Sequence, residues 1–206
     1  AAASAALPKL VVRHKNFCDV LSRPKVQGWH LTTLTRGCVV SPVAPAEDGW
    51  QKVLLADGRT GFVQASILGP WYTAPCCDDE DGLRAALVDA AKLYAGTHYR
   101  WGGKSPMGID CSGLVSMAYM LCGIYIYRNA KIVEGFPIRE ISRADMGPGD
   151  LLFFPGHVAM YMGEGRYCHS TGRSGDDGFT VNSLDPTAPD YRADLADKIT
   201  AVGSYF

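Results

Sequence analysis

Residues 99–123 read YRWGGKSPMGIDCSGLVSMAYMLCG and join a turn-rich segment to an apolar helical pattern. Pro106 and the glycines near it disfavour helix in the first part of this stretch. From Leu114 onwards apolar residues recur at helical spacing, and Gly123 is suited to end the helix. The pattern therefore predicts a helix that begins near Cys111.

A cysteine at the start of a helix can act as a nucleophile. Its thiolate is the reactive form, and an ordinary cysteine pKa of about 8.5 leaves little thiolate at neutral pH. Unpaired backbone N–H groups and the helix dipole favour negative charge there, which predicts a lowered pKa for Cys111. The alternative is that Cys111 is a small buried apolar residue, the commoner role of a lone cysteine.

The composition limits the classes of function. The chain has 206 residues, 47% of them hydrophobic, and a formal net charge of -1. This charge gives no basic surface for nucleic acid, and no apolar run approaches the roughly 18 residues of a membrane span. We therefore expect no nucleic-acid partner and no membrane span, and we expect a monomer.

The seven cysteines bear on the compartment. Their number is odd and Cys76 and Cys77 are adjacent, which does not suit a disulfide framework and slightly favours the cytoplasm. The small residues of AAASAALP, residues 1–8, resemble those beside a signal-peptidase site. An envelope or secreted location is therefore the alternative.

Residues 1–72 are expected to form a small all-β domain. Short β-rich runs alternate with turns, and Asp57-Gly58 between apolar runs predicts a hairpin. Short strands at regular spacing suggest a small barrel. Residues 73–82, with Pro75 and an acidic run, are expected to be a linker whose charges suit the start of the next helix.

Residues 83–206 are expected to form an α+β domain. Apolar residues from Leu83 to Tyr94 recur at helical spacing, so one helix precedes the helix near Cys111. The strands expected after these helices are residues 149–154, 157–162 and 166–169. Strands that follow helices in one unit favour an α+β layer over a doubly wound sheet.

Two histidines fall on the last two of these strands. A turn centred on Glu164 would pair His157 with Thr171 and make His169 a diagonal neighbour of His157 on the same face. A shift of one residue would separate the two histidines. Cys168 points to the other face and is expected to be a core thiol.

Three roles are open for this pair of histidines. One histidine can be a structural residue with satisfied hydrogen bonds. Both can hold zinc together with Cys111 or Cys168, although the chain has no Cys-x-x-Cys or His-x-x-x-His pair. The third role is a Cys-His-His chain, in which His157 takes the thiol proton and His169 orients the ring of His157.

Five motifs stand in order along this part of the chain. They are YRWGG (99–103), DCSGL (110–114), PGDL (148–151), HVAMY (157–161) and HS (169–170). In order and spacing they resemble the motifs of the NlpC/P60 family of cell-wall cysteine peptidases, and the resemblance implies a papain-like fold for roughly residues 83–206. Residues 37–68 also resemble the end of a bacterial SH3-like barrel, a domain that often precedes such peptidases.

The resemblance implies the catalytic roles. Cys111 would be the nucleophile, and His157 would be the general base and acid. His169 would orient His157 as the third residue. Tyr99 would support the oxyanion together with the backbone N–H of Cys111, as acyl transfer requires.

The resemblance also implies contacts to the substrate. Trp101 would form an aromatic wall of the cleft, and Asp110 and Ser112 would hold the substrate's N-terminal amine. In the branch of the family that acts on free stem peptides, the SH3-like domain closes one end of the cleft, and residues 47–50 are the expected contributors. Asn129 stands where relatives often carry an acid, which affects contacts to the leaving diamino acid.

The function implied is that of a cysteine endopeptidase. It would cleave the bond between γ-D-glutamate and a diamino acid (meso-diaminopimelate or L-lysine) in murein stem peptides with a free L-alanine amine. No metal or other cofactor is expected. The alternatives are a wall-peptide binding protein without turnover, an acyltransferase with the same cysteine and histidine chemistry and, more remotely, a zinc hydrolase.

Overall fold

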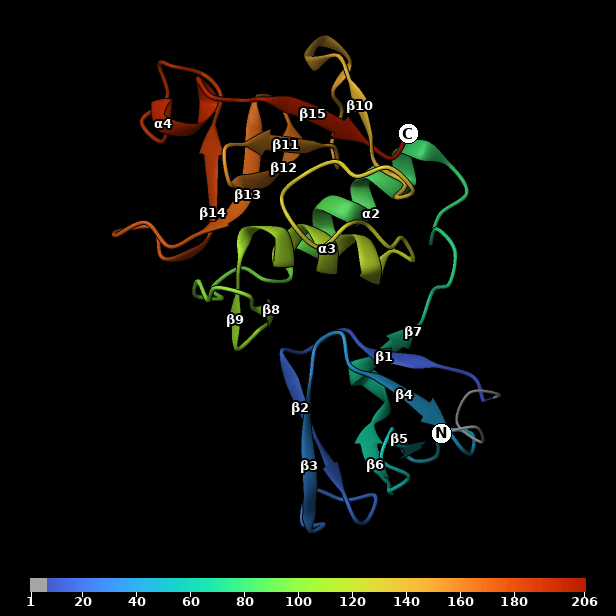
Figure 1. Ribbon diagram of the computed structural model, residues 1–206. Helices are drawn as coiled ribbons and strands as arrows, with labels where there is room; N and C mark the ends of the chain where they lie inside the picture. The colour runs from blue at the N-terminus through green and yellow to red at the C-terminus, as the bar shows by residue number, and fades with distance from the viewer. Residues whose placement is uncertain (1–6) are drawn as a thin grey trace. The chain divides into compact units, whose positions relative to one another are not determined.

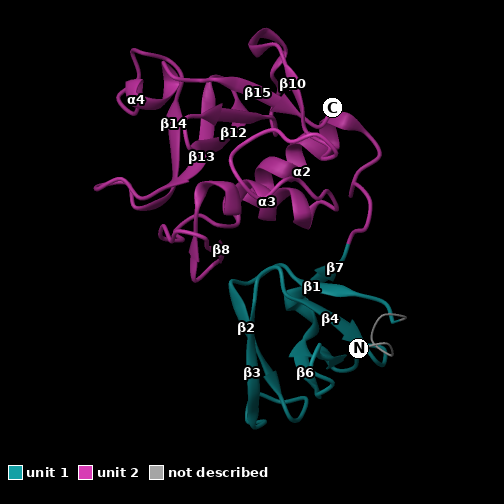
Figure 2. Ribbon diagram, viewed as in Figure 1, with its two compact units in different colours: residues 1–71 teal, residues 72–206 magenta. Residues whose placement is uncertain are grey.

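The structure, a computed structural model, describes residues 7–206. The chain forms two compact units that divide between Trp71 and Tyr72, as the two colours of Figure 2 show. Within the described residues, the first unit contains strands and one 3₁₀ turn, and the second unit contains both helices and strands.

The first unit is built from short strands paired in antiparallel fashion. They are β1 (Leu10–Val12), β2 (Phe17–Leu21), β3 (His30–Thr35), β4 (Val39–Pro42), β5 (Trp50–Leu54), β6 (Thr60–Gln64) and β7 (Leu68–Pro70), with the 3₁₀ turn at Ala65–Ile67. The predicted hairpin is present, because Leu54 of β5 pairs with Thr60 of β6. Gly58 at its tip has a φ of 88°, a left-handed conformation that glycine adopts without a steric cost.

The closed barrel expected for this unit is not found. Across the described residues the strand order is β3-β2-β6-β5-β4-β1-β7, which leaves β3 and β7 at the two edges. The β2–β3 hairpin is joined to the remaining strands through one pair, Leu21 with Phe62, so β3 does not return to β7. The all-β character was therefore predicted correctly, but the closure was not.

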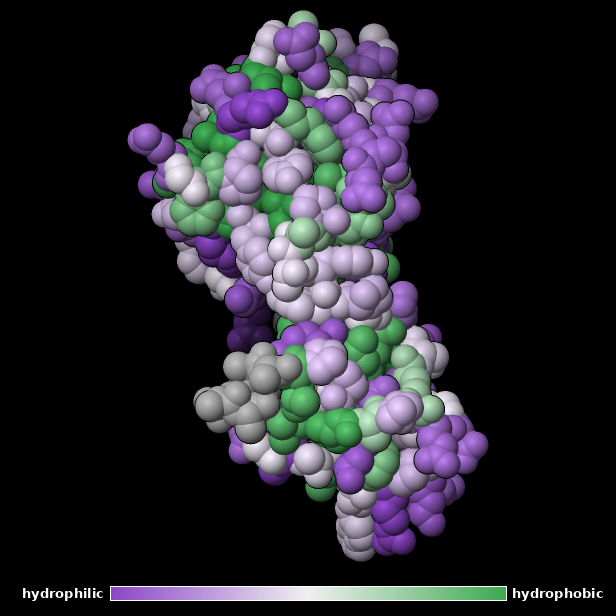
Figure 3. All heavy atoms as spheres, turned by 90° about the vertical axis from the view of Figure 1, so that its right-hand side faces the viewer, coloured by the Kyte–Doolittle hydropathy of each residue, from purple (hydrophilic) through white to green (hydrophobic). Residues whose placement is uncertain are grey.

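The core of the first unit is small and aliphatic. Its buried residues are Val12, Cys18, Val20, Val40, Val53, Leu55, Val63 and Leu68. Other large apolar side chains stay exposed, among them Val26 and Trp29. On the face drawn in Figure 3, this unit shows an apolar area bordered by polar residues.

The second unit packs helices on a sheet. Its elements are α2 (Glu80–Lys92), β8 (Lys104–Ser105), β9 (Gly108–Ile109), α3 (Cys111–Leu121), β10 (Arg139–Ile141), β11 (Leu151–Phe154), β12 (His157–Gly163), β13 (Arg166–Thr171), β14 (Gly178–Ser183), α4 (Ala193–Ala196) and β15 (Ala201–Ser204), with a 3₁₀ turn at Arg143–Asp145. Six strands form an antiparallel sheet in the order β10-β15-β11-β12-β13-β14. Figure 1 shows α2 and α3 on one side of this sheet, where they pack on each other and on β12. The α+β class is confirmed.

Helix α2 begins within the acidic run. Asp79 is its N-cap, and Oδ1 of Asp79 accepts a hydrogen bond of 2.7 Å from the N–H of Gly82. Glu80 and Asp81 lie in the first turn, where negative charge is favoured. The acidic run therefore starts the helix, and Glu80 to Gly82 of the expected linker 73–82 are helical.

Two properties concern the described chain as a whole. None of the helices in residues 7–206 has the length and apolar character needed to cross a bilayer. All seven cysteines are free thiols.

Candidate active site

Helix α3 begins at Cys111, where the sequence predicted a helix start. Asp110 is the N-cap, and its Oδ1 accepts a hydrogen bond of 2.6 Å from the N–H of Gly113. The helix ends at Leu121, and Gly123 shortly after it has a left-handed φ of 84°. Cys111 therefore occupies the first position of the helix, and it is 7% exposed.

Asp110 is also held by Arg128, a residue to which the sequence assigned no role. Nη1 of Arg128 lies 3.1 Å from Oδ1 of Asp110, and Nη2 lies 3.2 Å from Oδ2. Ser112 joins them, because its Oγ donates to Oδ1 of Asp110 and accepts from Nη1 of Arg128 at 2.7 Å. With the N–H groups of Gly102 and Gly113, five hydrogen bonds reach the carboxylate.

This network fixes the charge of Asp110. Burial acts to raise the pKa of Asp110, but the hydrogen bonds from Arg128 and Gly113 outweigh it, so the net pKa is lowered. The carboxylate stays ionised and paired. Because a carboxylate has about four lone-pair sites, five donors already saturate Asp110.

A cleft of about 660 Å³ opens beside the start of α3. It is lined by Tyr99, Trp101, Gly102, Asp110, Cys111, Ser112, Arg128, Asn129, Ala130, Lys131 and Gly156. Five of the residues selected from the sequence thus share one cleft, namely Tyr99, Trp101, Asp110, Cys111 and Ser112. The two histidines are not among its lining residues.

The histidines lie on neighbouring strands in the predicted register. Met160 of β12 pairs with Cys168 of β13, as predicted, although the turn itself differs: Gly163 pairs with Arg166, and an irregularity between Tyr161 and Gly163 shifts the strand into the predicted register. Nε2 of His157 lies 2.7 Å from Nδ1 of His169. The two rings meet edge to face with centroids 4.9 Å apart. Cys168 is fully buried, as expected for a core thiol.

The residues on either side of His157 in the chain lie near Cys111. The backbone N–H of Val158 donates a hydrogen bond to the thiol of Cys111. On the other side of His157, Gly156 lines the cleft. The chain neighbours of His157 therefore both reach the surroundings of Cys111.

Burial controls the protonation of these three groups. It raises the pKa of Cys111, although hydrogen bonds from the N–H groups of Val158 and Ser112 act in the other direction. The predicted lowering of the Cys111 pKa is therefore wrong for the protein without substrate. Burial, followed by repulsion from His169, lowers the pKa of His157 to about 3, and burial lowers the pKa of His169 to about 4. The thiol and both imidazoles are thus neutral near pH 7.

Tyr99 and Trp101 enter the cleft from the segment that precedes α3. Tyr99 forms an isolated parallel bridge with Ile109, which ties it to the residues just before the helix. Burial and the neighbouring Cys111 raise the pKa of Tyr99, so its hydroxyl remains protonated and can donate. Trp101 is 85% exposed and lines the cleft, so its ring is accessible to a ligand there.

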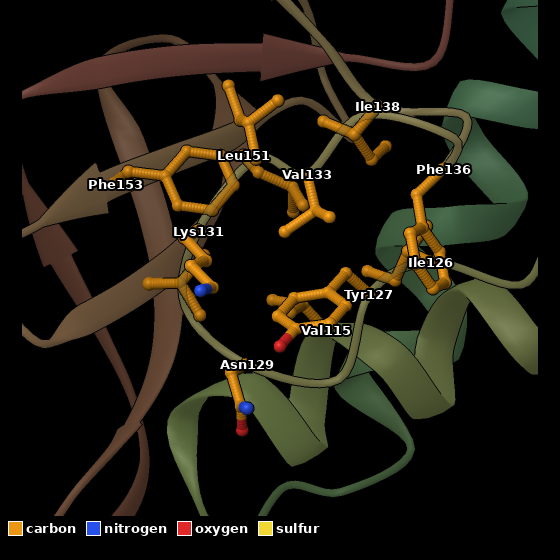
Figure 4. Close-up of a pocket in the computed structure, with 12 residues that line it drawn as sticks. Val115, Ile126, Tyr127, Asn129, Lys131, Val133, Phe136, Ile138, Leu151 and Phe153 are labelled. Atoms are coloured by element: carbon orange, nitrogen blue, oxygen red, sulfur yellow. The ribbon is translucent and has the colours of Figure 1, made fainter.

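The loop that borders the other side of the cleft rests on a second, apolar pocket. Figure 4 shows Tyr127, Val133 and Phe136 of this loop facing side chains from α3 and β11. Tyr127 and Phe136 meet edge to face at 5.2 Å. The free volume is only about 10 Å³, so this pocket is filled by the protein's own side chains. Lys131 lines both pockets, which places this anchored loop at the cleft.

The structure adds one residue behind the histidines. Nε2 of His169 lies 2.9 Å from Oδ1 of Asn182 on β14. The sequence contained one signal for Asn182, a polar residue within the strand run GFTVNS. It did not indicate that β14 pairs with β13, so it could not place Asn182 beside His169. Across residues 7–206 there is no group of three or more His, Cys, Asp or Glu residues arranged to hold a metal ion.

Comparisons with known proteins identify relatives of the chain. Residues 96–190 match the NlpC/P60 family. A protein of Lysinibacillus sphaericus named dipeptidyl-peptidase 6 is 48% identical over 195 residues, which cover 93% of this chain and 71% of that protein. A protein of Bacillus cereus named gamma-D-glutamyl-L-lysine dipeptidyl-peptidase is 30% identical over 133 residues, 58% of this chain and 37% of that protein.

A solved structure supports the fold over nearly the whole chain. The crystal structure of an NlpC/P60 family protein from Bacillus cereus superimposes with a TM-score of 0.77 and covers 99% of this chain. The sequences are 22% identical, and the match spans 65% of that protein, just under two thirds of its length.

Proposed function

This chain belongs to the NlpC/P60 family, and we propose that it is a cysteine peptidase of peptidoglycan stem peptides. Its target would be the bond between γ-D-glutamate and a diamino acid. One observation carries the proposal: the thiol of Cys111, at the start of α3, opens on a cleft beside the hydrogen-bonded pair His157 and His169. The names of the two bacterial relatives, a dipeptidyl-peptidase and a gamma-D-glutamyl-L-lysine dipeptidyl-peptidase, support the substrate class.

The first chemical step would form a thioester. Because the Cys111 thiol and His157 are neutral at rest, the thiol passes its proton to His157 as the sulfur attacks the γ-carbonyl carbon. The Tyr99 hydroxyl and the backbone N–H of Cys111 donate to the oxygen that becomes negative. His157 then gives the proton to the amine of the diamino acid as the C–N bond breaks.

The second step would release the acyl group. Water loses a proton to His157, attacks the thioester carbon and displaces the Cys111 sulfur, which regains the proton. His169 would keep the ring of His157 in place through both steps, since its Nδ1 lies 2.7 Å from Nε2 of His157. The cycle balances without a metal or another cofactor.

We assign the two ends of the cleft from their side chains. Trp101, which is exposed and large, would cover the peptide as an aromatic wall. Asp110 and Ser112 would lie at the end that receives the free L-alanine amine. Since Arg128 already pairs with Asp110, the contribution of Asp110 would be a local negative field and a fixed Ser112 hydroxyl rather than a lone carboxylate.

The first unit would serve as an SH3-like accessory domain that binds wall peptides. The hairpin of β5 and β6 supports this proposal, since it lies in the stretch 37–68 that resembles such domains. The open strand order found for the described residues means that the unit would be a variant of that fold.

The proposal is tested with L-Ala-γ-D-Glu-meso-diaminopimelate and its L-lysine counterpart. We expect mass spectrometry to detect release of L-Ala-D-Glu by the wild-type protein and none by Cys111→Ala. Unchanged cleavage by Cys111→Ala would refute the cysteine mechanism, and loss of cleavage with EDTA would favour a zinc hydrolase. Tight binding of the peptide without any cleavage would identify a wall-peptide binding protein, and transfer of the dipeptide to an added amine would identify an acyltransferase.

The requirement for a free amine is tested separately. Acetylation of the L-alanine amine removes its positive charge, so cleavage is expected to fall sharply while the scissile bond is unchanged. Equal rates with the free and the acetylated peptide would contradict the assignment of Asp110 and Ser112 to the amine end.

A further inference from the structure

Asn182 lies behind the two histidines and is almost fully buried. It is on strand β14, directly opposite Tyr167 of β13, which makes it a diagonal neighbour of His169 on the same face. Asn182 is 5% exposed and His169 is fully buried. A polar pair in this position needs internal hydrogen-bond partners, because water does not reach it.

The neighbours of Asn182 fix the direction of its amide group. Nδ2 lies 2.8 Å from the backbone carbonyl oxygen of Asp190, which can only accept a hydrogen bond. The amide nitrogen must therefore face Asp190, and Oδ1 must face Nε2 of His169, 2.9 Å away. The position of Asp190 is itself secured, because its carboxylate pairs with Arg166 at 2.9 Å.

The amide direction decides where His169 carries its proton. Oδ1 of Asn182 can only accept, so Nε2 of His169 is the nitrogen that bears hydrogen. Since burial lowers the pKa of His169 to about 4, the ring is neutral near pH 7 and has one N–H. Its Nδ1 is then a lone pair, and the partner of that lone pair, Nε2 of His157, must donate.

The tautomer of His169 also determines the tautomer of His157. His157 is also neutral near pH 7, because burial lowers its pKa to about 3, so a proton on Nε2 leaves Nδ1 of His157 unprotonated. We propose that Asn182 is a positioning residue that fixes the tautomers of His169 and His157 and so keeps Nδ1 of His157 free as the base for Cys111. This inference rests on the proposed function, in which His157 is that base.

Loss of the Asn182 acceptor would permit the opposite arrangement. His169 could then carry its proton on Nδ1 and donate it to Nε2 of His157. His157 would hold its own proton on Nδ1, and it would have no lone pair for the thiol proton. The hydrogen bond between the two histidines would remain, but Nδ1 of His157 would carry a proton and could not act as the base.

The tautomers are measured by NMR of the full chain with ¹⁵N-labelled histidine at neutral pH. His157→Gln and His169→Gln variants assign the signals. In the wild-type protein we expect protonated Nε2 and unprotonated Nδ1 for both histidines. A proton on Nδ1 of either ring would overturn the proposal, and this result requires no variant of Asn182 to fold.

A pair of variants then isolates the role of Asn182. Asn182→Leu has a similar size and no acceptor, and Ser183→Ala removes a hydroxyl from the next residue of the same strand, which is 4% exposed. In Asn182→Leu we expect mixed tautomers and a kcat about 10- to 100-fold lower with little change in KM. Ser183→Ala is expected to keep the wild-type tautomers and kcat.

The outcomes separate this proposal from the proposed function. Wild-type tautomers together with wild-type kcat in a folded Asn182→Leu variant would refute the positioning role. A wild-type protein that cleaves no stem peptide would refute the proposed function, but the NMR result for the two histidines would still decide the tautomers.

Discussion

Helices α2 and α3 begin with the same arrangement and differ in everything around it. In each, an aspartate N-cap accepts a hydrogen bond from the N–H of a glycine three residues later: Asp79 from Gly82 at 2.7 Å, and Asp110 from Gly113 at 2.6 Å. Asp79 is exposed beside further acids, whereas Asp110 is buried and paired with Arg128.

The difference shows what turns a helix start into a candidate active site. A cap and a helix dipole are present in both cases, so they cannot be sufficient. At α3 the first residue is a cysteine that opens on a cleft, and the residue pair His157 and His169 stands beside it. The local sequence provides the helix start, and the surrounding sheet provides the chemistry.

Replacement of the first residue of each helix should give the largest contrast. Cys111→Ser removes the thiol and is expected to lower kcat/KM for the stem peptide by about 10⁴-fold or more, because the nucleophile acts as a unit with its base. Glu80→Ala changes the equivalent residue of α2 and should leave the rate unchanged. Peptide release is measured by mass spectrometry. Comparable activity in both variants would contradict the claim that only the first residue of α3 is needed for cleavage.

Removal of the two caps should affect stability unequally. Asp110→Ala leaves Arg128 without its carboxylate partner in a half-buried site, and we expect a loss of about 3–4 kcal/mol in the free energy of unfolding. Asp79→Ala removes an exposed cap and should cost about 1 kcal/mol. Urea denaturation of both variants measures the difference. Equal losses would mean that Arg128 contributes little.

Acid should weaken the surroundings of α3 through the buried histidines. Their folded-state pKa values of about 3 and about 4 lie below the ordinary value of 6.5, so the unfolded chain binds more protons as the pH falls. Their contribution is fully present above about pH 6.5 and is lost as the pH falls towards the folded-state pKa values, a change on the order of 3 kcal/mol for each histidine by pH 4. Urea midpoints at several pH values should show this slope, and the double variant His157→Gln/His169→Gln should flatten it. An unchanged slope in the double variant would rule out the histidines as its cause.

Substitution of the glycine that donates to each N-cap should give the smallest difference in stability between the two helix starts. A Cβ on Gly113 would lie 2.1 Å from the backbone oxygen of Gly103, so Gly113→Ala should cost about 2 kcal/mol of stability. A Cβ on Gly82 would meet only the movable carboxylate of Asp79 at 2.7 Å. For Gly82→Ala, a helix-propensity gain of roughly 0.5–1 kcal/mol should offset that shift. Thermal unfolding measures both, and a larger cost at Gly82 would reverse the comparison.

Local patterns predicted the parts of the fold that depend on neighbouring residues. The start of α3 at Cys111, the hairpin at Asp57-Gly58 and the pairing of Met160 with Cys168 were predicted by short-range rules, whereas the register shift between Tyr161 and Gly163 was not. They were sufficient to bring His157 and His169 together.

Long-range contacts and the extent of burial could not be predicted from the sequence. The ion pair of Asp110 with Arg128 joins a helix start to a loop, and Asn182 reaches His169 from an edge strand whose register no short turn specifies. The pKa of Cys111 depends on how much solvent the fold removes, so the helix start alone predicted the wrong direction. The prediction of a closed barrel was wrong for a related reason, because closure depends on pairing between strands far apart in the chain.

The most direct test of the account is to trap the acyl-enzyme. Wild-type protein is mixed with L-Ala-γ-D-Glu-meso-diaminopimelate, quenched in acid within the first turnovers, digested and analysed by mass spectrometry. We predict an L-Ala-γ-D-Glu thioester on the peptide that contains Cys111 and on no other cysteine peptide. Product release with the adduct on another cysteine, or with no adduct at any time of quenching, would contradict Cys111 as the nucleophile.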